Sequence, residues 1–445
     1  NLIERNQRPL TVQLILKLAA TYHVEPEELH GDAGGSAAAL REVFSDPLLA
    51  GELPGDQEVI EIAEAAPNAS AAVVKLYRAY REQAERLSDL NALLASEGRA
   101  AALSGARLPI DETRETFERR PNHFSTLEEE AEAFGAVLDP GDDLFGALKA
   151  WLKREHGIVV KVLPVATMPN WRRRYDRHSQ RLFLSERLSP FDQLREVAME
   201  ACLIRMAVAV AAQIQALKFS NDEARRLARF ELGRYAAHAL MMPYQPFHAA
   251  AQRARYDIDV LRSRFGVSFE QAANRLTTLQ RPESAAVPFF MLEVDSAGNR
   301  FRRAGAQGFP VSRFGGGCPK LPVHAAFAQP GQIFVEAVEM PDGAQFLCVA
   351  RTLEGPQGAF NERPRRTALL VGCDIGFKDE IVYGAALPGV PPGAAAKAGQ
   401  GAATPVGPAC RLCERIGCLS RAEPPVTRPL GLDEMVTGLS AFDFQ

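Results

Sequence analysis

The chain has 445 residues, of which 47% are hydrophobic and 24% are charged, and its formal net charge is −4. This composition is that of a globular protein, with a length sufficient for three domains at roughly 100–200 residues each. Seven cysteines in such a length argue against a disulfide framework, and neither a signal peptide nor a membrane-spanning run is recognisable. We therefore expect a cytoplasmic protein of the α+β class that does not associate with a membrane.

Residues 1–30 have the pattern of half a DNA-binding module. A helix end and a polar turn are followed by an amphipathic helix with apolar side chains at Val12, Ile15 and Leu16. The stretch resembles the second half of the helix-turn-helix domain of the Xre family. That resemblance implies DNA contacts from four side chains, Arg5, Asn6, Gln7 and Arg8. The alternative is an ordinary helical surface with solvated arginines. The earlier helices of the domain are missing, which favours a fragment or a disordered start.

A helical connector is expected over residues 36–120. Apolar periodicity predicts three helices, at residues 37–44, 57–64 and 70–97. The longest carries Val73, Leu76 and Tyr80 at helical spacing, which is typical of a connector or a dimer seam. Because helix-turn-helix repressors bind paired half-sites with two-fold symmetry, we expect a homodimer.

A mostly helical unit is predicted over residues 121–282. Its expected elements are helices at 127–138 and 143–156, a strand at 159–165, a β-hairpin at 171–186, and helical stretches at 188–217 and 221–242. The apolar run inside 188–217 is interrupted by Glu200, Arg205 and Gln213, so it does not have the composition of a membrane span.

This order of elements resembles the domain of the ImmA/IrrE metallopeptidases. In that family a His-Glu-x-x-His helix supplies two zinc ligands and a general base, and a later glutamate supplies the third ligand. The matching positions here are Arg195-Glu196-Val197-Ala198-Met199 and Glu231. Arginine and methionine cannot replace two imidazoles on zinc, so the resemblance implies a protease fold without catalytic residues, whose cleft holds a ligand. We expect no enzymatic activity; an active metallopeptidase is the alternative.

Cationic side chains beside this helix form the candidate ligand site. Arg172, Arg173, Arg174 and Tyr175 lie on the predicted hairpin, where guanidinium groups could receive phosphates, and Arg195 replaces a zinc ligand nearby. A run of like charges is more often a solvated face, and that interpretation remains open.

Residues 283–445 are expected to be rich in strands. Runs of β-branched and aromatic residues bounded by Gly, Pro and Asp predict strands at 288–294, 301–304, 332–338, 344–350 and 367–372. Residues 388–408 are rich in Gly, Pro and Ala, which predicts a mobile tether.

Three cysteines within nine residues, Cys410, Cys413 and Cys418, predict a metal centre. A Cys-x-x-Cys pair lets two thiolates approach one metal from a single turn, and the third cysteine adds another ligand. We expect Cys318 as the fourth ligand, because the three glycines before it allow a close approach of the backbone; Cys373 is its rival. Spacing alone leaves zinc and a four-iron cluster open, as well as a surface loop of uncommitted thiols.

Together the three units resemble the short-chain fatty-acyl transcriptional regulators, which include regulators of propionate and glyoxylate metabolism. The resemblance rests on the N-terminal half-module, the hairpin, the degenerate peptidase helix, residues 265–276 and the Cys-x-x-Cys ending. It implies an effector such as propionyl- or acetyl-coenzyme A, and a four-iron cluster (4Fe–4S) that we expect to be a structural staple in preference to a redox sensor. A zinc-stabilised regulator without a small effector is the alternative.

Overall fold

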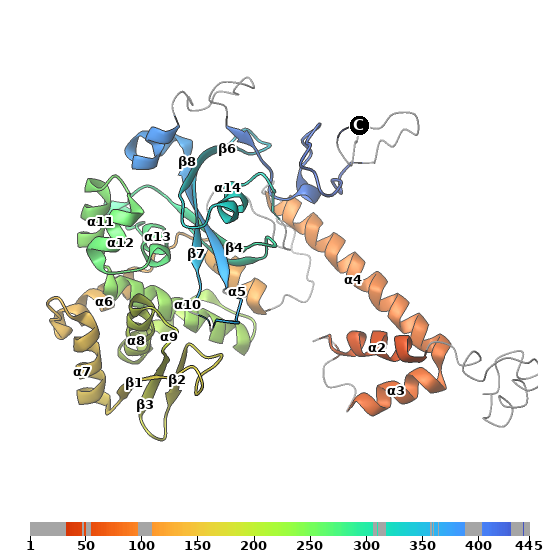
Figure 1. Ribbon diagram of the computed structural model, residues 1–445, viewed down its shortest axis with the longest axis horizontal. Coiled ribbons are helices and arrows are strands. Elements are labelled where there is room, and N and C mark those ends of the chain that lie inside the picture. Colours follow the sequence, from red (N-terminus) through yellow and green to blue (C-terminus); the bar gives the residue numbers. More distant parts are fainter. Residues whose placement is uncertain are drawn as a thin grey trace, which may run out of the picture. The chain divides into compact units, whose positions relative to one another are not determined.

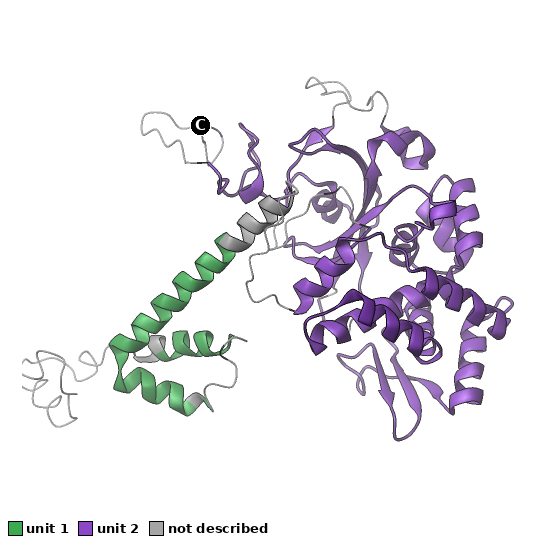
Figure 2. Ribbon diagram, turned by 180° about the vertical axis from the view of Figure 1, so that it is seen from behind, with its two compact units in different colours: residues 1–91 green, residues 92–445 purple. Residues whose placement is uncertain are grey.

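The computed structural model describes residues 33–46, 49, 55–96, 109–305, 309, 317–356, 358, 360–363, 365–387, 403–428 and 439. The chain divides into two compact units, residues 1–91 and 92–445 (Figure 2), and each is described by itself. Helices and two mixed sheets give the α+β class, as predicted. The four expected DNA-contacting residues, Arg5, Asn6, Gln7 and Arg8, lie outside the described residues.

The first unit is helical. Its elements are α2 (Ala33–Phe44), α3 (Asp56–Ala65) and most of α4 (Pro67–Ser96), which confirms the three predicted helices. Leu40, Val59 and Ala63 form a small apolar core. Along α4, the side chains of Val73, Leu76 and Tyr80 are exposed. The apolar face of α4 is therefore only partly used within its own unit.

The second unit begins with helices and a small sheet. Its first elements are α5 (Pro109–Glu118), α6 (Ser125–Leu138), α7 (Leu144–His156), β1 (Val159–Leu163), β2 (Arg173–Asp176) and β3 (Arg181–Ser185). Strands β2 and β3 pair antiparallel, which confirms the predicted hairpin, and β1 pairs parallel with β3. Helix α7 starts where the Asp143 side chain accepts a hydrogen bond from the Gly146 amide, and it ends at Gly157 in the left-handed conformation.

Six further helices follow: α8 (Pro190–Arg205), α9 (Ala207–Leu217), α10 (Asp222–Met241), α11 (Tyr244–Arg253), α12 (Ile258–Phe265) and α13 (Phe269–Leu276). The helical stretch predicted at 188–217 consists of two helices, because the chain bends by 84° between α8 and α9. Among the described helices, none alone has the length and apolar character to cross a membrane; only this bent pair does so in combination. Apolar spacing did not predict α5, α11, α12 or α13.

A six-stranded sheet organises the rest of the unit, in the order β5-β4-β8-β7-β6-β9. The strands are β4 (Phe290–Asp295), β5 (Arg300–Ala304), β6 (Phe334–Glu339), β7 (Gln345–Glu354), β8 (Arg366–Asp374) and β9 (Thr404–Pro405), with one short helix, α14 (Pro322–Ala325). Short 3₁₀ turns lie at Pro282–Ser284, Ala326–Ala328, Ile375–Glu380, Val382–Ala386 and Cys410–Leu412. Four of the five strand pairings are antiparallel, and β6 with β9 is parallel.

Both faces of this sheet are covered (Figure 1), which explains why its central strands β7 and β8 are apolar and buried over most of their length. Leu347 and Leu369 face the large core shared with the helices, whereas Cys348 and Leu370 face a second core beneath α14. Successive residues of a strand point to opposite faces, so β7 and β8 contribute to both cores.

The expected tether over residues 388–408 is wrong for its final part. Thr404 and Pro405 form β9 and pair with Val338 and Glu339 of β6, and Val406 is buried beneath the sheet edge. The physical reason is that apolar side chains in this Gly- and Pro-rich stretch find a core to enter. Residues 388–402 lie outside the described residues.

Candidate functional site

Four cysteines from two distant segments line one pocket. Cys318 comes from the loop before α14, and Cys410, Cys413 and Cys418 come from the segment after β9; the remaining lining residues are Pro319, Gly407, Ala409, Ser420 and Arg421. We call this the cysteine pocket. Cys373, the rival fourth ligand, is fully buried at the end of β8 in the large core and does not line the pocket. The structure thus brings together the four cysteines that the sequence singles out.

Backbone geometry leaves room for the sulfur atoms. A Cβ atom added to Gly407 would lie 2.7 Å from the Cys413 Sγ, closer than any real contact, so only glycine fits at this position. Gly417, next to Cys418, adopts a φ of +68°, which favours glycine. The cysteine segment therefore depends on two glycines, one for close approach and one for a turn.

Main-chain amides point at the thiols. The Ala422 amide donates to the Cys410 Sγ at 3.5 Å. Burial raises the pKa of the Cys318 thiol, while hydrogen bonds from the Lys320 and Gly407 amides act in the opposite direction. Amide donors to sulfur are what a metal-bound thiolate needs around it.

Donor type, clearance and amide contacts in the cysteine pocket all fit a thiolate-bound metal. Within the described ranges, no group of three or more His, Cys, Asp or Glu side chains is arranged so that it could hold a metal ion as it stands. The four cysteines nevertheless line one common pocket. Four thiolates suit zinc or iron, which are the two metals that the spacing leaves open.

The residues expected to bind a ligand are only partly brought together. Arg195 is buried on α8 and forms ion pairs with Asp192 at 2.9 Å and Glu196 at 3.2 Å. Arg172 donates to the same Glu196 carboxylate at 3.3 Å, and Arg173 reaches its main-chain oxygen at 3.1 Å. These three guanidinium groups are thus held by carboxylates of α8, where the zinc ligands of a peptidase would lie.

The other two predicted residues lie apart from this group. The Arg174 guanidinium is exposed and stacks on the Trp171 ring, 5.4 Å from its centroid. The Tyr175 hydroxyl donates to Gln180 at the turn of the hairpin. An anion that approaches the hairpin from solvent would therefore meet Arg174 before Arg173 or Arg195.

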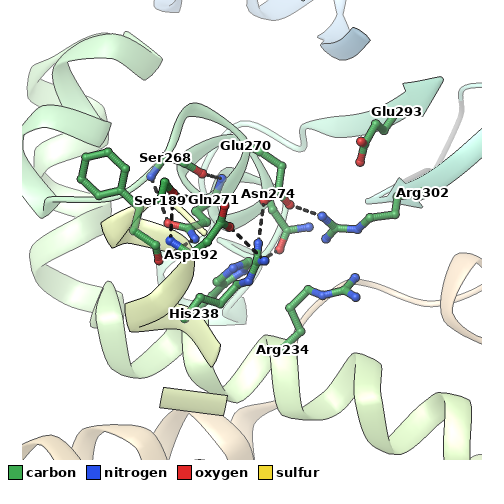
Figure 3. Close-up of polar contacts among 12 residues, drawn as sticks. Ser189, Asp192, Arg234, His238, Ser268, Glu270, Gln271, Asn274, Glu293 and Arg302 are labelled. Carbon is green, nitrogen blue, oxygen red and sulfur yellow. Dashed lines mark hydrogen bonds and ion pairs between the residues drawn. The ribbon is translucent and has the colours of Figure 1, made fainter. Parts of the chain in front are cut away.

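A buried polar cluster that sequence reasoning missed lies next to Arg195. We call it the Glu270 cluster: Arg195, His238, Glu270, Asn274 and Arg302. Glu270, at the start of α13, pairs with Arg302 of β5 (Figure 3). It also pairs with Arg195 of α8 at 3.2 Å. The His238 Nδ1 lies 2.9 Å from the Asn274 Oδ1. One carboxylate thus joins the former peptidase helix to the sheet.

The charges of the cluster hold its residues in defined protonation states. Burial opposes ionisation of Glu270, but the nearby Arg302 and Arg195 outweigh it and keep the pKa of this carboxyl below its ordinary value of 4.5. Burial lowers the pKa of His238 to about 3, so its ring is neutral at physiological pH. Its Nε2 atom has no hydrogen-bond partner among the described residues.

Only one sequence signal pointed toward the Glu270 cluster. Ser268 and Gln271 form a capping box, which marks the start of α13 and places Glu270 in its first turn. Nothing local indicates that Arg302, on a strand that follows, would be its partner.

Two known protein families match successive parts of the second unit. Residues 153–277 match the family described as "IrrE N-terminal-like domain", and residues 278–442 match "Short-chain fatty acyl coenzyme A regulator, C-terminal". The Glu270 cluster therefore spans the two matched regions, because Arg302 lies in the second and the other members in the first.

Several curated proteins are similar over nearly the whole chain. The chain is 35% identical to "HTH-type transcriptional regulator RamB" of Mycobacterium tuberculosis, over 99% of this chain and 92% of that protein. It is 32% identical to "Propionyl-CoA carboxylase regulator" of Cereibacter sphaeroides, over 100% and 92%. It is 30% identical to "HTH-type transcriptional regulator PrpR" of M. tuberculosis, over 98% and 87%.

A solved structure shares the fold. A chain titled "Mycobacterium tuberculosis transcriptional regulator" matches with a TM-score of 0.68 and 31% sequence identity, and the match covers 75% of this chain and 99% of that one.

Proposed function

Because the chain belongs to the short-chain fatty acyl coenzyme A regulator family of transcriptional regulators, we propose that it couples the level of a short-chain acyl-coenzyme A to promoter binding in the cytoplasm. The observation that carries the proposal is similarity to transcriptional regulators along the whole chain. Members of this family regulate transcription and are not enzymes, in line with the loss of both zinc-ligand histidines at positions 195 and 199.

The effector proposed is propionyl- or acetyl-coenzyme A, bound by the domain that matches the IrrE-like family. Its phosphates would meet the exposed Arg174 and Arg172 first, with Tyr175, Arg173 and Arg195 behind them. An effector changes DNA binding only if it favours one arrangement of the regulator over another, since equal affinity for both shifts nothing. We propose that the regulator is a homodimer, because paired half-sites require two-fold symmetry; the exposed apolar face of α4 is available for such a contact.

DNA binding by the full-length protein is expected to depend on both salt and effector. Titration of its own promoter DNA at two salt concentrations should show affinity falling steeply with salt, because Arg5 and Arg8 are proposed to contact phosphates. Propionyl-coenzyme A should change that affinity, whereas free coenzyme A, the matched control, should change it less. Binding that is indifferent to salt would contradict the DNA interface, and binding indifferent to every acyl-coenzyme A would contradict the effector.

The metal proposed for the cysteine pocket is a four-iron cluster held by Cys318, Cys410, Cys413 and Cys418. Such a cluster would supply a cross-link between two distant segments and a one-electron redox centre. We propose that the cross-link is its main role, because ligands from separate segments contribute folding energy whether or not redox is sensed.

Replacing Cys413 by alanine is expected to remove iron and acid-labile sulfide from anaerobically purified protein, with loss of the visible absorbance that dithionite bleaches. The matched control is Cys202→Ala, since Cys202 is a buried thiol of α8 outside the pocket. It should keep wild-type iron and colour. Zinc in place of iron in the wild-type protein would favour the zinc-stabilised alternative, and iron unaffected by Cys413→Ala would place the metal elsewhere.

A further inference from the structure

One arginine side chain enters the wall of the cysteine pocket. Arg421 is buried and lines the pocket together with the four cysteines. Its Nη2 atom donates to the carbonyl oxygens of Cys413 at 2.9 Å and Arg415 at 2.7 Å. Its Nη1 atom donates to the carbonyl oxygens of Cys410 at 3.2 Å and Glu423 at 3.4 Å.

These contacts fold the cysteine segment around a single guanidinium group. All four acceptors are main-chain carbonyls between residues 410 and 423, so Arg421 holds the turn that carries the Cys-x-x-Cys pair from the inside. A planar group with five donors suits this task, because several carbonyls can be bound at fixed angles at once. The positions of Cys410 and Cys413 therefore depend on the Arg421 side chain.

The charge of Arg421 also lies close to Cys410 and Cys413, because its guanidinium donates to the main-chain carbonyls of both residues. Thiolates on a metal centre carry negative charge. A buried cation in the wall favours that charge, and it favours the reduced state of a redox centre over the oxidised one, because reduction adds an electron.

We propose that Arg421 is the positioning residue of the cysteine pocket: it shapes the segment that presents Cys410 and Cys413 and supplies positive charge beside the sulfurs, without being a metal ligand itself. The inference rests on the metal centre proposed above. It adds a residue that the spacing of the cysteines does not reveal.

Another arginine of the same segment offers a matched control. Arg411 lies outside the pocket lining and pairs with Glu423 at 2.8 Å, and its side chain is 46% exposed. Arg411→Met removes the same atoms from the same segment as Arg421→Met does. It leaves the residues that line the pocket unchanged.

The test uses full-length protein freed of metal under anaerobic conditions and titrated with Co²⁺ against a competing chelator. Visible absorbance of cobalt bound to thiolate reports occupancy of the pocket, independently of DNA binding. Arg421→Met and Arg421→Lys are expected to weaken Co²⁺ binding by about 10–100-fold, the usual cost of removing an outer partner of a metal site. Arg411→Met should stay within about twofold of wild type, since outer partners alone carry that cost.

A second readout separates charge from shape. In protein purified with its cluster, the reduction potential should shift to a more negative value in Arg421→Met, whereas Arg421→Lys keeps the charge and should keep the wild-type potential. If Arg421→Met does not fold, as judged by circular dichroism, Arg421→Lys carries the affinity test. Co²⁺ affinities of both Arg421 variants equal to that of Arg411→Met would overturn the inference. Wild-type protein that binds neither iron nor Co²⁺ would overturn the metal centre itself.

Discussion

Replacing Arg275 by methionine is expected to lower the free energy of unfolding by about 3–5 kcal/mol, the usual cost of removing one partner of a buried ion pair. Arg275 is fully buried and pairs with Glu128 through two hydrogen bonds of 2.6 and 2.8 Å. Tyr235 donates to the same carboxylate at 2.6 Å. Without Arg275, the Glu128 charge remains in the core between α6 and α10. Urea unfolding followed by circular dichroism measures the loss.

Two further variants serve as controls for the effect of Arg275→Met on stability. Arg281→Met removes a more exposed arginine that pairs with Glu132, and it should cost about 0–1 kcal/mol. The double variant Arg275→Met with Glu128→Met replaces both charges by apolar groups and should be more stable than Arg275→Met alone, since no uncompensated charge remains. A single variant as stable as wild type would show that the pair contributes nothing.

The same pair predicts how stability depends on pH. Burial opposes ionisation of Glu128, but Arg275 outweighs it and keeps the pKa of this carboxyl below its ordinary value of 4.5. A depressed pKa in the folded state contributes stability that is present above the unfolded value and is lost as pH falls through the folded one. Wild-type protein should therefore lose stability below about pH 4.5, and Arg275→Met should lose less of it there.

Replacing Glu270 by glutamine is expected to lower the free energy of unfolding by about 3 kcal/mol and to loosen the junction between α8 and β5. Glutamine has the shape of glutamate but leaves Arg195 and Arg302 facing each other without the carboxylate between them. Hydrogen exchange of the β5 amides should accelerate, because their strand loses its link to the helices.

Glu283→Gln is the matched control for Glu270→Gln, since Glu283 is an exposed glutamate. It should leave both the unfolding free energy and the exchange rates unchanged. If Glu270→Gln had the same unfolding free energy and exchange rates as this control, the Glu270 cluster would not stabilise the contact between the two matched regions.

Local patterns predicted much of the fold. The helices α2, α3, α4, α6, α7 and α10 follow from apolar spacing, and the β2–β3 hairpin follows from alternation and its turn. The break at Met206 could not be predicted in this way, because the apolar pattern of α8 and α9 continues across it. Only packing in the folded chain shows that one stretch becomes two helices at a steep angle.

Spacing along the sequence predicts one part of the candidate site and does not predict another. Cys410, Cys413 and Cys418 are close in sequence, and three glycines marked Cys318 as a partner, so their meeting could be predicted. The Glu270 cluster could not be predicted, because Glu270 and Arg302 are 75 and 107 residues from Arg195 along the chain and meet it only through tertiary packing. The run of charges also does not reveal that Arg172 and Arg173 pair with carboxylates of α8.

Among the described residues, the two-residue strand β9 pairs with only Val338 and Glu339 at the sheet edge, and Arg415 adds hydrogen bonds to Glu339. A metal joining Cys318 to Cys410 would fasten that segment a second time and would enclose about 90 residues, including β6, β7 and β8, in a covalent ring. Closing a ring of this size restricts the unfolded chain by about 4–5 kcal/mol in the chain-entropy model. Oxidative loss of the metal would then remove a cross-link that encloses β6, β7 and β8 and would leave β9 to attach the C-terminal segment to the sheet.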